Sequence, residues 1–194
     1  MEENARKAWL LKQRYGKDAV PENIIWNDTV DQLLSHLSVR KYLNESLPEG
    51  AIETMIAAAQ SASTSSNLHQ WSVVAITDQK KKEEIAKISR LGSKFGMGNP
   101  YIEQAPVFLL WIADVSRNNK IAKSKGGNAE IHQYTDAFLM ASIDTAIAAQ
   151  NAVVAAESMG LGIVYIGAMR NNAKEIAEYI NLPKYSYVVF GMVV

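Results

Sequence analysis

Residues 144–172 read DTAIAAQNAVVAAESMGLGIVYIGAMRNN, a long apolar helix pattern followed by a short strand pattern. The alanine-rich first half continues a helical signal that we place from about Ile131 to Met159. A helix that is apolar on nearly every side is typical of a central core helix or of one shared with a partner subunit. Gly160 is the expected helix stop, because glycine readily adopts the left-handed conformation that ends many helices. Residues 161–167 then read as a buried strand.

Three further strands are predicted on either side of this stretch: WSVVAIT at 71–77, VFLLWIAD at 107–114 and SYVVFGMVV at 186–194. Their continuous apolar centres fit burial on both faces. Helix patterns are predicted near residues 1–16, 27–37, 48–60, 78–89 and 170–183. Asp78 is placed to cap the fourth of these helices, and Asn172 with Glu175 forms a capping-box pattern at the start of the fifth. The polar residues 115–129 are expected to form a mobile loop.

The composition excludes several classes of protein. The chain has 194 residues, 48% of them apolar and 21% charged, which is typical of one globular domain. The formal net charge is zero, which argues against a bulk nucleic-acid or membrane-surface binder. The chain has no cysteine, so thiolate nucleophiles, disulfides and iron–sulfur clusters are excluded, and its three histidines are not at metal-ligand spacing. Any redox chemistry must therefore depend on a bound cofactor.

The N-terminus carries charges of both signs and lacks the apolar core of a signal peptide. The longest clean apolar run, Val107 to Ala113, is far shorter than the roughly 20 residues that span a bilayer. We therefore expect a soluble cytoplasmic protein that binds neither nucleic acid nor membrane. GLGIVYIG at residues 160–167 superficially resembles a dinucleotide fingerprint, but it follows a helix and enters a strand, which is the wrong order.

Three separated segments carry groups suited to a ligand. In an extended His36–Arg40 segment, residues 36, 38 and 40 point the same way and present an imidazole, a hydroxyl and a guanidinium, which suits a phosphate. Residues 63–67, STSSN, offer short polar side chains that can hydrogen-bond a polyol or a heterocycle edge. Gly167 and Ala168 end a strand and leave its backbone open to a flat ligand. Alone, each segment is also compatible with an ordinary surface loop or strand end.

Together these segments resemble the FMN-dependent nitroreductases, and most closely their group A, the oxygen-insensitive NADPH nitroreductases and flavin reductases. Four stretches carry the resemblance: HLSVRKY (36–42), STSSNLHQW (63–71), DTAIAAQNAVVAAESMGLG (144–162) and VYIGAMRNN (164–172). The resemblance covers about residues 27–194. It implies an α+β fold with three layers, α-β-α, in which helices flank a mixed four-stranded sheet. It also implies that residues 1–194 form one FMN-binding domain, and that the long central helix forms the core of a homodimer with FMN at the interface.

The resemblance also implies a set of cofactor-binding residues: His36, Leu37, Ser38, Val39, Arg40, Thr64, Ser65, Ser66, Asn67, Tyr165, Ile166, Gly167 and Ala168. Of these, His36, Ser38 and Arg40 are expected to hold the FMN phosphate. The three hydroxyl residues at 64–66 are expected to meet the ribityl chain or the flavin edge, and Asn67 matches the family's usual Asn. The last four bring their backbone close to flavin N5 and O4. Arg170 is expected at the mouth of the site, where it meets a nucleotide phosphate or an acidic substrate.

The implied activity is NAD(P)H-dependent reduction of nitroaromatics, quinones or free flavin by ping-pong, two-electron hydride transfer. No catalytic side chain and no metal are expected, because the flavin carries the chemistry. The sequence departs from the family pattern at His69 and Gln70, where many members have Gln and Pro. Family chains usually also continue beyond the last strand, in a tail with Lys and Arg contacts to the FMN phosphate. Two alternatives remain open: an FMN-binding protein without efficient turnover, and a dimeric interaction module without flavin.

Overall fold

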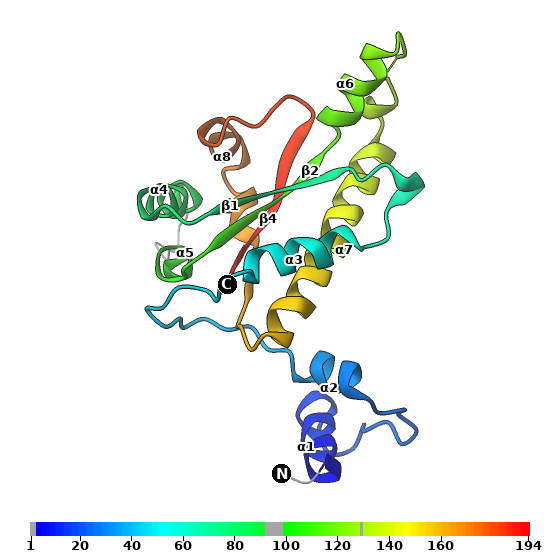
Figure 1. Cartoon of the computed structure of the whole chain (residues 1–194), viewed down its shortest axis with the longest axis vertical. Helices are drawn as coiled ribbons and strands as arrows, with labels where there is room; N and C mark the ends of the chain where they lie inside the picture. The colour runs from blue at the N-terminus through cyan, green and yellow to red at the C-terminus, as the bar shows by residue number, and fades with distance from the viewer. Residues whose placement is uncertain (1–2, 92–98, 129) are drawn as a thin grey trace. The chain divides into compact units, whose positions relative to one another are not determined.

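The computed structural model describes residues 3–91, 99–128 and 130–194 (Figure 1). The chain divides into two compact units, Met1–Leu37 and Ser38–Val194, and each is described by itself. In the first unit, α1 (Glu3–Tyr15) is joined to α2 (Asp28–Ser35) by a two-point ion pair. Arg6 donates from Nε to Asp31 Oδ1 at 2.8 Å and from Nη2 to Asp31 Oδ2 at 2.6 Å. The Asn27 side chain caps the start of α2 by accepting from Val30 N.

The second unit is built on four strands: β1 (Trp71–Ile76), β2 (Phe108–Asp114), β3 (Val164–Ile166) and β4 (Ser186–Val193). They lie in the order β1-β2-β4-β3, and each pair of neighbours among these described strands is antiparallel. The prediction of a mixed sheet is therefore wrong. Continuous apolar strands indicate that both faces of a sheet are covered, and this pattern is the same whichever way the neighbouring strands run.

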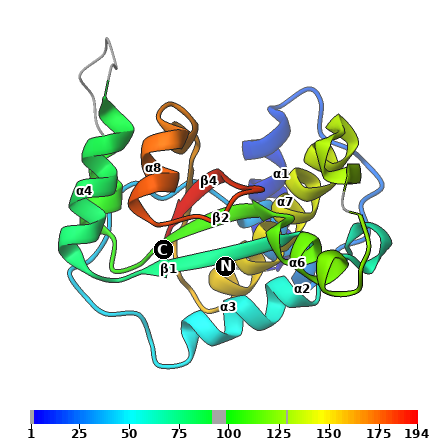
Figure 2. The ribbon, with the colours of Figure 1, turned by 90° about the horizontal axis from the view of Figure 1, so that it is seen from above.

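Helices cover both faces of the sheet, which confirms the three-layer α-β-α arrangement (Figure 2). One face packs against α3 (Ala51–Gln60) and α7 (Thr135–Ser158), and the other against α4 (Gln79–Arg90), α5 (Pro100–Gln104) and α8 (Ala173–Tyr179). Strand β2 shows why both layers form. Its residues alternate, with Leu109 and Trp111 in the first core cluster and Phe108, Leu110 and Ile112 in the second.

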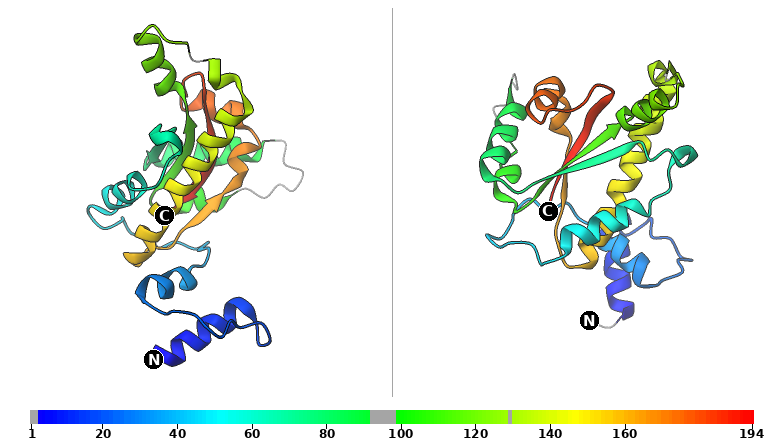
Figure 3. Two further views of the ribbon diagram at one scale, coloured as in Figure 1. Left: turned by 90° about the vertical axis from the view of Figure 1, so that its right-hand side faces the viewer. Right: turned by 45° about the horizontal axis from the view of Figure 1, so that its top comes forward.

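Two local predictions are corrected by tertiary contacts. The expected mobile loop after β2 contains a helix, α6 (Ser116–Ser124), whose entry is fixed by the Asp114 carboxylate (Figure 3). That carboxylate accepts from Ser116 N at 2.9 Å and from Ser116 Oγ at 2.6 Å. The predicted Asn172 cap of α8 is also wrong, because the Asn172 amide instead donates to the carbonyls of Ile88 and Leu91 at 2.9 and 3.0 Å. By contrast, the Asp78 cap of α4 is confirmed by its 2.8 Å bond from Lys81 N.

The long helix α7 is buried on one side only. Its alanines, including Ala148 and Ala152, pack fully buried against the sheet, and Gly160 follows the helix at φ +77° as expected. Its outer side exposes four large apolar side chains: Phe138, Leu139, Ile143 and Ile147. By length and composition α7 could cross a membrane, but core helices of soluble proteins meet the same criteria, and 44% of its apolar window is buried inside the fold.

Candidate functional site

Residues 38–40 of the first predicted segment lie in the second unit, beside the strand that carries the third. Val39 N donates to Ile163 O at 2.8 Å, and Val39 O accepts from the Tyr42 hydroxyl at 2.8 Å. Gly162 lies so close that a Cβ there would be 2.6 Å from Val39 Cγ2. This contact fixes residues 38–40 beside the entrance to β3. Ser38 and Arg40 remain exposed, and Arg40 Nη1 makes only a long 3.5 Å bond to Ser38 O.

His36 and Leu37 belong to the first unit. His36 is the C-cap residue of α2, where helix carbonyls lack partners within the helix. Arg14 of α1 supplies donors to this end, with Nε bonding Leu34 O at 3.0 Å and Nη2 bonding His36 O. Leu37 is exposed. Within this unit, the backbone that leads into the predicted phosphate segment is therefore fixed by an arginine from the N-terminal helix.

The third segment, Tyr165–Ala168, runs from β3 into a 3₁₀ turn, η3 (Gly167–Arg170). Tyr165 packs edge-on against Phe190, with ring centroids 4.9 Å apart, and its hydroxyl donates to Gln150 Oε1 at 3.4 Å. Burial raises the pKa of the Tyr165 phenol above its ordinary value, so the hydroxyl stays a donor at neutral pH. Ile166 is buried, whereas Gly167 and Ala168 are half-buried.

Arg170 lies back over this segment. Its Nη1 donates to Val189 O at 2.7 Å, and a Cβ on Gly167 would lie 3.3 Å from its Nη2. The absence of a side chain at Gly167 thus leaves room for the guanidinium. The side chain is exposed, so the predicted role of Arg170 toward a nucleotide phosphate or an acidic substrate stays a prediction.

The second segment forms a 3₁₀ turn, η1 (Ser65–Asn67), with an unusual backbone. Ser66, Asn67 and His69 have φ values of 51°, 54° and 47°, the left-handed region that costs about 1–2 kcal/mol for a residue with a side chain. Ser66 and Asn67 are exposed, and Thr64 and Ser65 are half-buried. Strain of this kind persists only where the surroundings impose it, and it clusters at functional sites.

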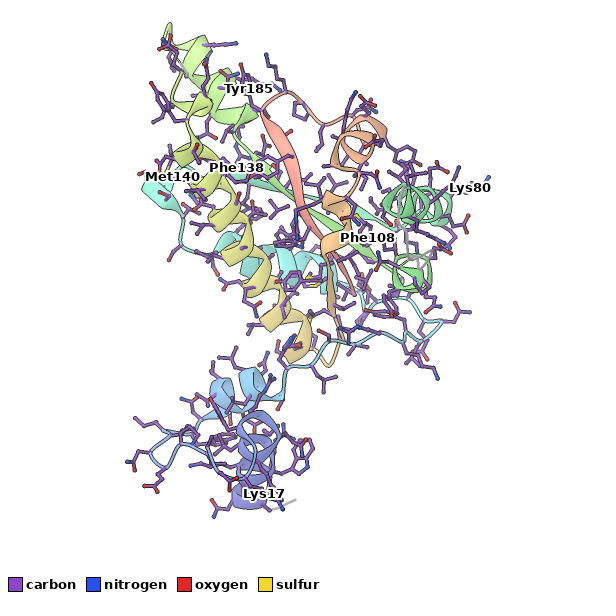
Figure 4. The ribbon with its side chains drawn as sticks, turned by 180° about the vertical axis from the view of Figure 1, so that it is seen from behind. Lys17, Lys80, Phe108, Phe138, Met140 and Tyr185 are labelled. Atoms are coloured by element: carbon purple, nitrogen blue, oxygen red, sulfur yellow. The ribbon has the colours of Figure 1, made fainter. Side chains whose placement is uncertain are left out.

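Asp144 of α7 is a site residue that the sequence analysis missed. Its Oδ1 accepts from Ser65 N at 2.9 Å. Met140, which is labelled on the same helix in Figure 4, accepts from Ser65 Oγ through its Sδ at 3.2 Å. The Asp144 side chain is buried, yet its Oδ2 accepts no hydrogen bond from any described residue. A buried carboxylate oxygen without a donor is costly. In the sequence, Asp144 stands out as the charged residue in the middle of this helix, whose other charged residues, Asp136 and Glu157, lie near its two ends.

The three segments do not converge within one chain. The loop that carries Ser65 precedes β1, whereas Tyr165 lies on β3, and these strands form opposite edges of the sheet. Three strand spacings separate the edges by about 14 Å. Figures 1 and 3 show the loop before β1 and the turn after β3 on different sides of the unit. Residues 38–40 and the β3 strand therefore form one cluster, and residues 64–67 form a second. Over the described ranges, no group of three or more His, Asp or Glu side chains is arranged to hold a metal ion.

The model of the family described as "Nitroreductase family" matches residues 33–194. The chain belongs to the nitroreductase family. An FMN reductase (NADPH) of Bacillus subtilis is 36% identical over 170 residues, covering 87% of this chain and 65% of that protein. An NADPH-flavin oxidoreductase of Vibrio harveyi is 37% identical over 167 residues, covering 86% and 64%.

Solved structures agree with these relatives. The structure described as NADPH:FMN oxidoreductase from Vibrio harveyi complexed with NAD+ has a TM-score of 0.75 at 36% identity, covering 86% of this chain and 67% of that one. The nitroreductase-like fold predicted from the sequence is thereby confirmed. The chain spans just under two thirds of the length of the two reductases to which it is similar.

Proposed function

We propose that this protein is an FMN-dependent NAD(P)H oxidoreductase. The observation that carries the proposal is the exposed Ser38–Arg40 pair, which Val39 holds beside the start of β3, the strand that leads into Gly167 and Ala168. A phosphate group suits the first part of this cluster, because an arginine can bind it with two parallel hydrogen bonds. A flat ring suits the second part. The names of the similar reductases, which include FMN and NADPH, support the same cofactor and electron donor.

The residues present fit FMN. His36, Ser38 and Arg40 would hold the phosphate, the Thr64–Asn67 turn would meet the ribityl chain or ring edge, and the backbone of Tyr165–Ala168 would approach the ring. Asp144 Oδ2, which accepts no hydrogen bond from the described residues, is an acceptor on the carboxylate that binds Ser65 N and suits a hydroxyl or N–H donor. When bound, FMN supplies hydride chemistry, accepting two electrons from NAD(P)H and passing them to an electron-poor acceptor.

The protein's own groups bind and orient in this proposal. No side chain needs to act as nucleophile or base, and Arg170 is placed to attract a nucleotide phosphate or an acidic substrate. Nitroaromatics, quinones and free flavin are the proposed acceptors, and donor and acceptor occupy the same site in turn, which gives ping-pong kinetics. We place the activity in the cytoplasm, because NADPH is supplied there. A chain without cysteines forms no disulfides and so does not need an oxidising compartment.

A homodimer is the form that would complete the site. One chain separates residues 64–67 from residues 165–168, and α7 presents an apolar face that a partner can cover. Two copies related by a two-fold axis would let the Thr64–Asn67 turn of one chain face the Tyr165–Ala168 segment of the other. FMN would then lie at the interface.

Placing a charge on this face should separate the subunits. Ile143 is 55% exposed in the single chain, so Ile143→Asp should leave each chain folded while burying an unpaired carboxylate in the dimer. Light scattering should report about twice the 21.4 kDa chain mass for the wild type and the single mass for the variant. The matched control is Lys80→Asp on α4, which should remain dimeric. A monomeric wild type, or a variant that stays dimeric, would contradict the proposal.

The absorption spectrum of the purified protein, recorded before and after NADPH, tests the proposed activity. A flavin spectrum that bleaches with NADPH and recovers on adding nitrofurazone or a quinone supports the oxidoreductase. FMN that is bound stoichiometrically but is bleached by neither NADPH nor NADH would instead identify a flavin-binding protein without turnover. A colourless protein that takes up no FMN at micromolar concentration would leave only the interaction module.

A further inference from the structure

We propose that Arg117 and Asn118, in the first turn of α6, are positioning residues that hold the loop of residues 64–70 in its left-handed conformation. This inference rests on the proposed function, because it assigns that loop to the FMN site. Neither residue belongs to the four stretches that carry the family resemblance. Both act on the loop through its backbone and are not assigned a contact with the cofactor.

Both side chains donate to carbonyls at the end of the loop. Arg117 Nη2 bonds His69 O and also reaches Trp71 O at 3.4 Å. Asn118 Nδ2 bonds Leu68 O at 3.1 Å. The carbonyls of Leu68, His69 and Trp71 thus accept from two neighbouring residues of α6. The carbonyl of Gln70, which lies between them, accepts from Asp114 N at 2.9 Å. The other end of the loop is held by the Asp144 bond to Ser65 N.

The loop needs such contacts because its backbone is unfavourable. Ser66, Asn67 and His69 all have positive φ, and none of them is glycine. Asparagine tolerates this region, whereas serine and histidine adopt it less readily. The local bond between His69 Nε2 and Asn67 Oδ1, at 2.6 Å, links two of these residues to each other and does not attach them to the rest of the fold. Attachment comes from α6 and α7.

Packing does not supply the missing restraint. Behind the loop lies a cavity of about 290 Å³ between α6 and α7, lined mainly by apolar side chains: Leu68, Ile121, Ala122, Ile131, Ala137 and Met140. Leu68 is 39% exposed on its other side. On the side that borders this open pocket, Leu68 packs against few neighbouring atoms, so it has few dispersion contacts to resist displacement. Hydrogen bonds from Arg117 and Asn118 must therefore fix this end of the loop.

The turn that carries the two residues is itself rigidly attached to the sheet. Asp114, the last residue of β2, accepts from Ser116 and also from Ser72 Oγ of β1 at 2.7 Å. Burial alone would raise the pKa of Asp114, but the hydrogen bonds from Ser116 and Ser72, with the charge of Arg117, outweigh it and hold the pKa below its ordinary value. Asp114 is thus ionised at neutral pH, and it links the start of α6 to both strands.

Hydrogen exchange of the FMN-free protein, combined with an FMN titration, tests the inference. In Arg117→Ala, the amides of residues 66–70 should exchange about tenfold faster, while those of α7 stay protected. The FMN dissociation constant should also rise about tenfold. Both changes are the size expected for the loss of one charge-assisted hydrogen bond. Arg117→Lys should recover part of both effects. Asn118→Ala should show the same pattern more weakly. Lys120→Ala, an exposed cation of the same helix, is the matched control and should change neither quantity.

The exchange measurement separates this inference from the proposed function. If the wild type binds no FMN but Arg117→Ala still loosens residues 66–70 selectively, the proposed function fails and the positioning role stands. Unchanged exchange in this loop in both Arg117→Ala and Asn118→Ala would overturn the positioning role, whatever the FMN affinity. The third outcome applies if the wild type binds FMN. If Arg117→Ala then speeds exchange in the loop without changing the FMN affinity, the assignment of this loop to the FMN site is overturned.

Discussion

Arg40→Ala should weaken FMN binding by about 10- to 100-fold and leave riboflavin binding unchanged. A hydrogen bond to a charged group contributes about 1.5–3 kcal/mol, and each 1.4 kcal/mol is a factor of ten in affinity. Arg40 is exposed and makes only a long bond within its own segment, so its removal should not disturb the fold. Titrating the quenching of flavin fluorescence measures both affinities on the same apoprotein.

Riboflavin makes this comparison specific, because it shares the ring and the ribityl chain with FMN but lacks the phosphate. Lys41→Ala is the matched control, since Lys41 is the exposed neighbouring cation and lies outside the predicted phosphate contacts. Equal losses for the two flavins would show that Arg40 acts on the ring or on the fold. Unchanged affinity for both would mean that the phosphate binds elsewhere.

Local signals predicted most of the fold. The helix that ends at Gly160, the strand after it and the Asp78 cap depend on residues within a few positions of one another, and all three are confirmed. Strand direction was not predictable in this way. Burial on both faces produces the same apolar run in parallel and antiparallel strands, and so the sheet was expected to be mixed.

Contacts between distant residues account for what the sequence analysis missed. Helix α6 has few apolar residues, and its start is fixed by Asp114, which also binds Ser72, 42 positions earlier. The Asp144 bond to Ser65 joins residues 79 positions apart. The Asn172 side-chain amide donates to backbone carbonyls more than 80 positions away. A pattern read along the chain contains none of these partners. The hydroxyl-rich turn at residues 63–67 was recognised as polar, but its left-handed backbone was not predicted.

The two clusters of site residues have different structural origins, which affects how each would respond to mutation. Residues 38–40 are held by a single backbone bond and by contact with Gly162, beside a strand of only three residues. The Thr64–Asn67 turn is held by Asp144 and Met140 of α7, and the residues that follow it are held by side chains of α6. Substitutions in the sheet core should therefore affect the first cluster directly, because β3 pairs only with β4 among the described strands.

Gly191→Ala should destabilise the protein by about 3 kcal/mol, the upper end of the usual cost of overpacking. Gly191 lies in β4, between Leu110 of β2 and Ile166 of β3. A Cβ there would be 2.4 Å from both Cε2 and Cζ of Phe108, whose ring is completely buried, and 3.2 Å from Met169 Cγ of η3. Since the Phe108 ring has no free space to enter, β4 itself must shift, and β3 with it.

Urea unfolding of Gly191→Ala, Phe108→Leu and the double variant measures this cost. If the added methyl collides with the Phe108 ring, the smaller leucine should relieve the collision, and the double variant should be more stable than the sum of the two single effects predicts. The displaced β3 should also weaken FMN binding in Gly191→Ala, because Ile166 is directly followed by Gly167 and Ala168. A strictly additive cycle would show that the ring is not the obstacle. A Gly191→Ala variant as stable as the wild type would mean that the sheet absorbs the extra methyl without displacing Phe108.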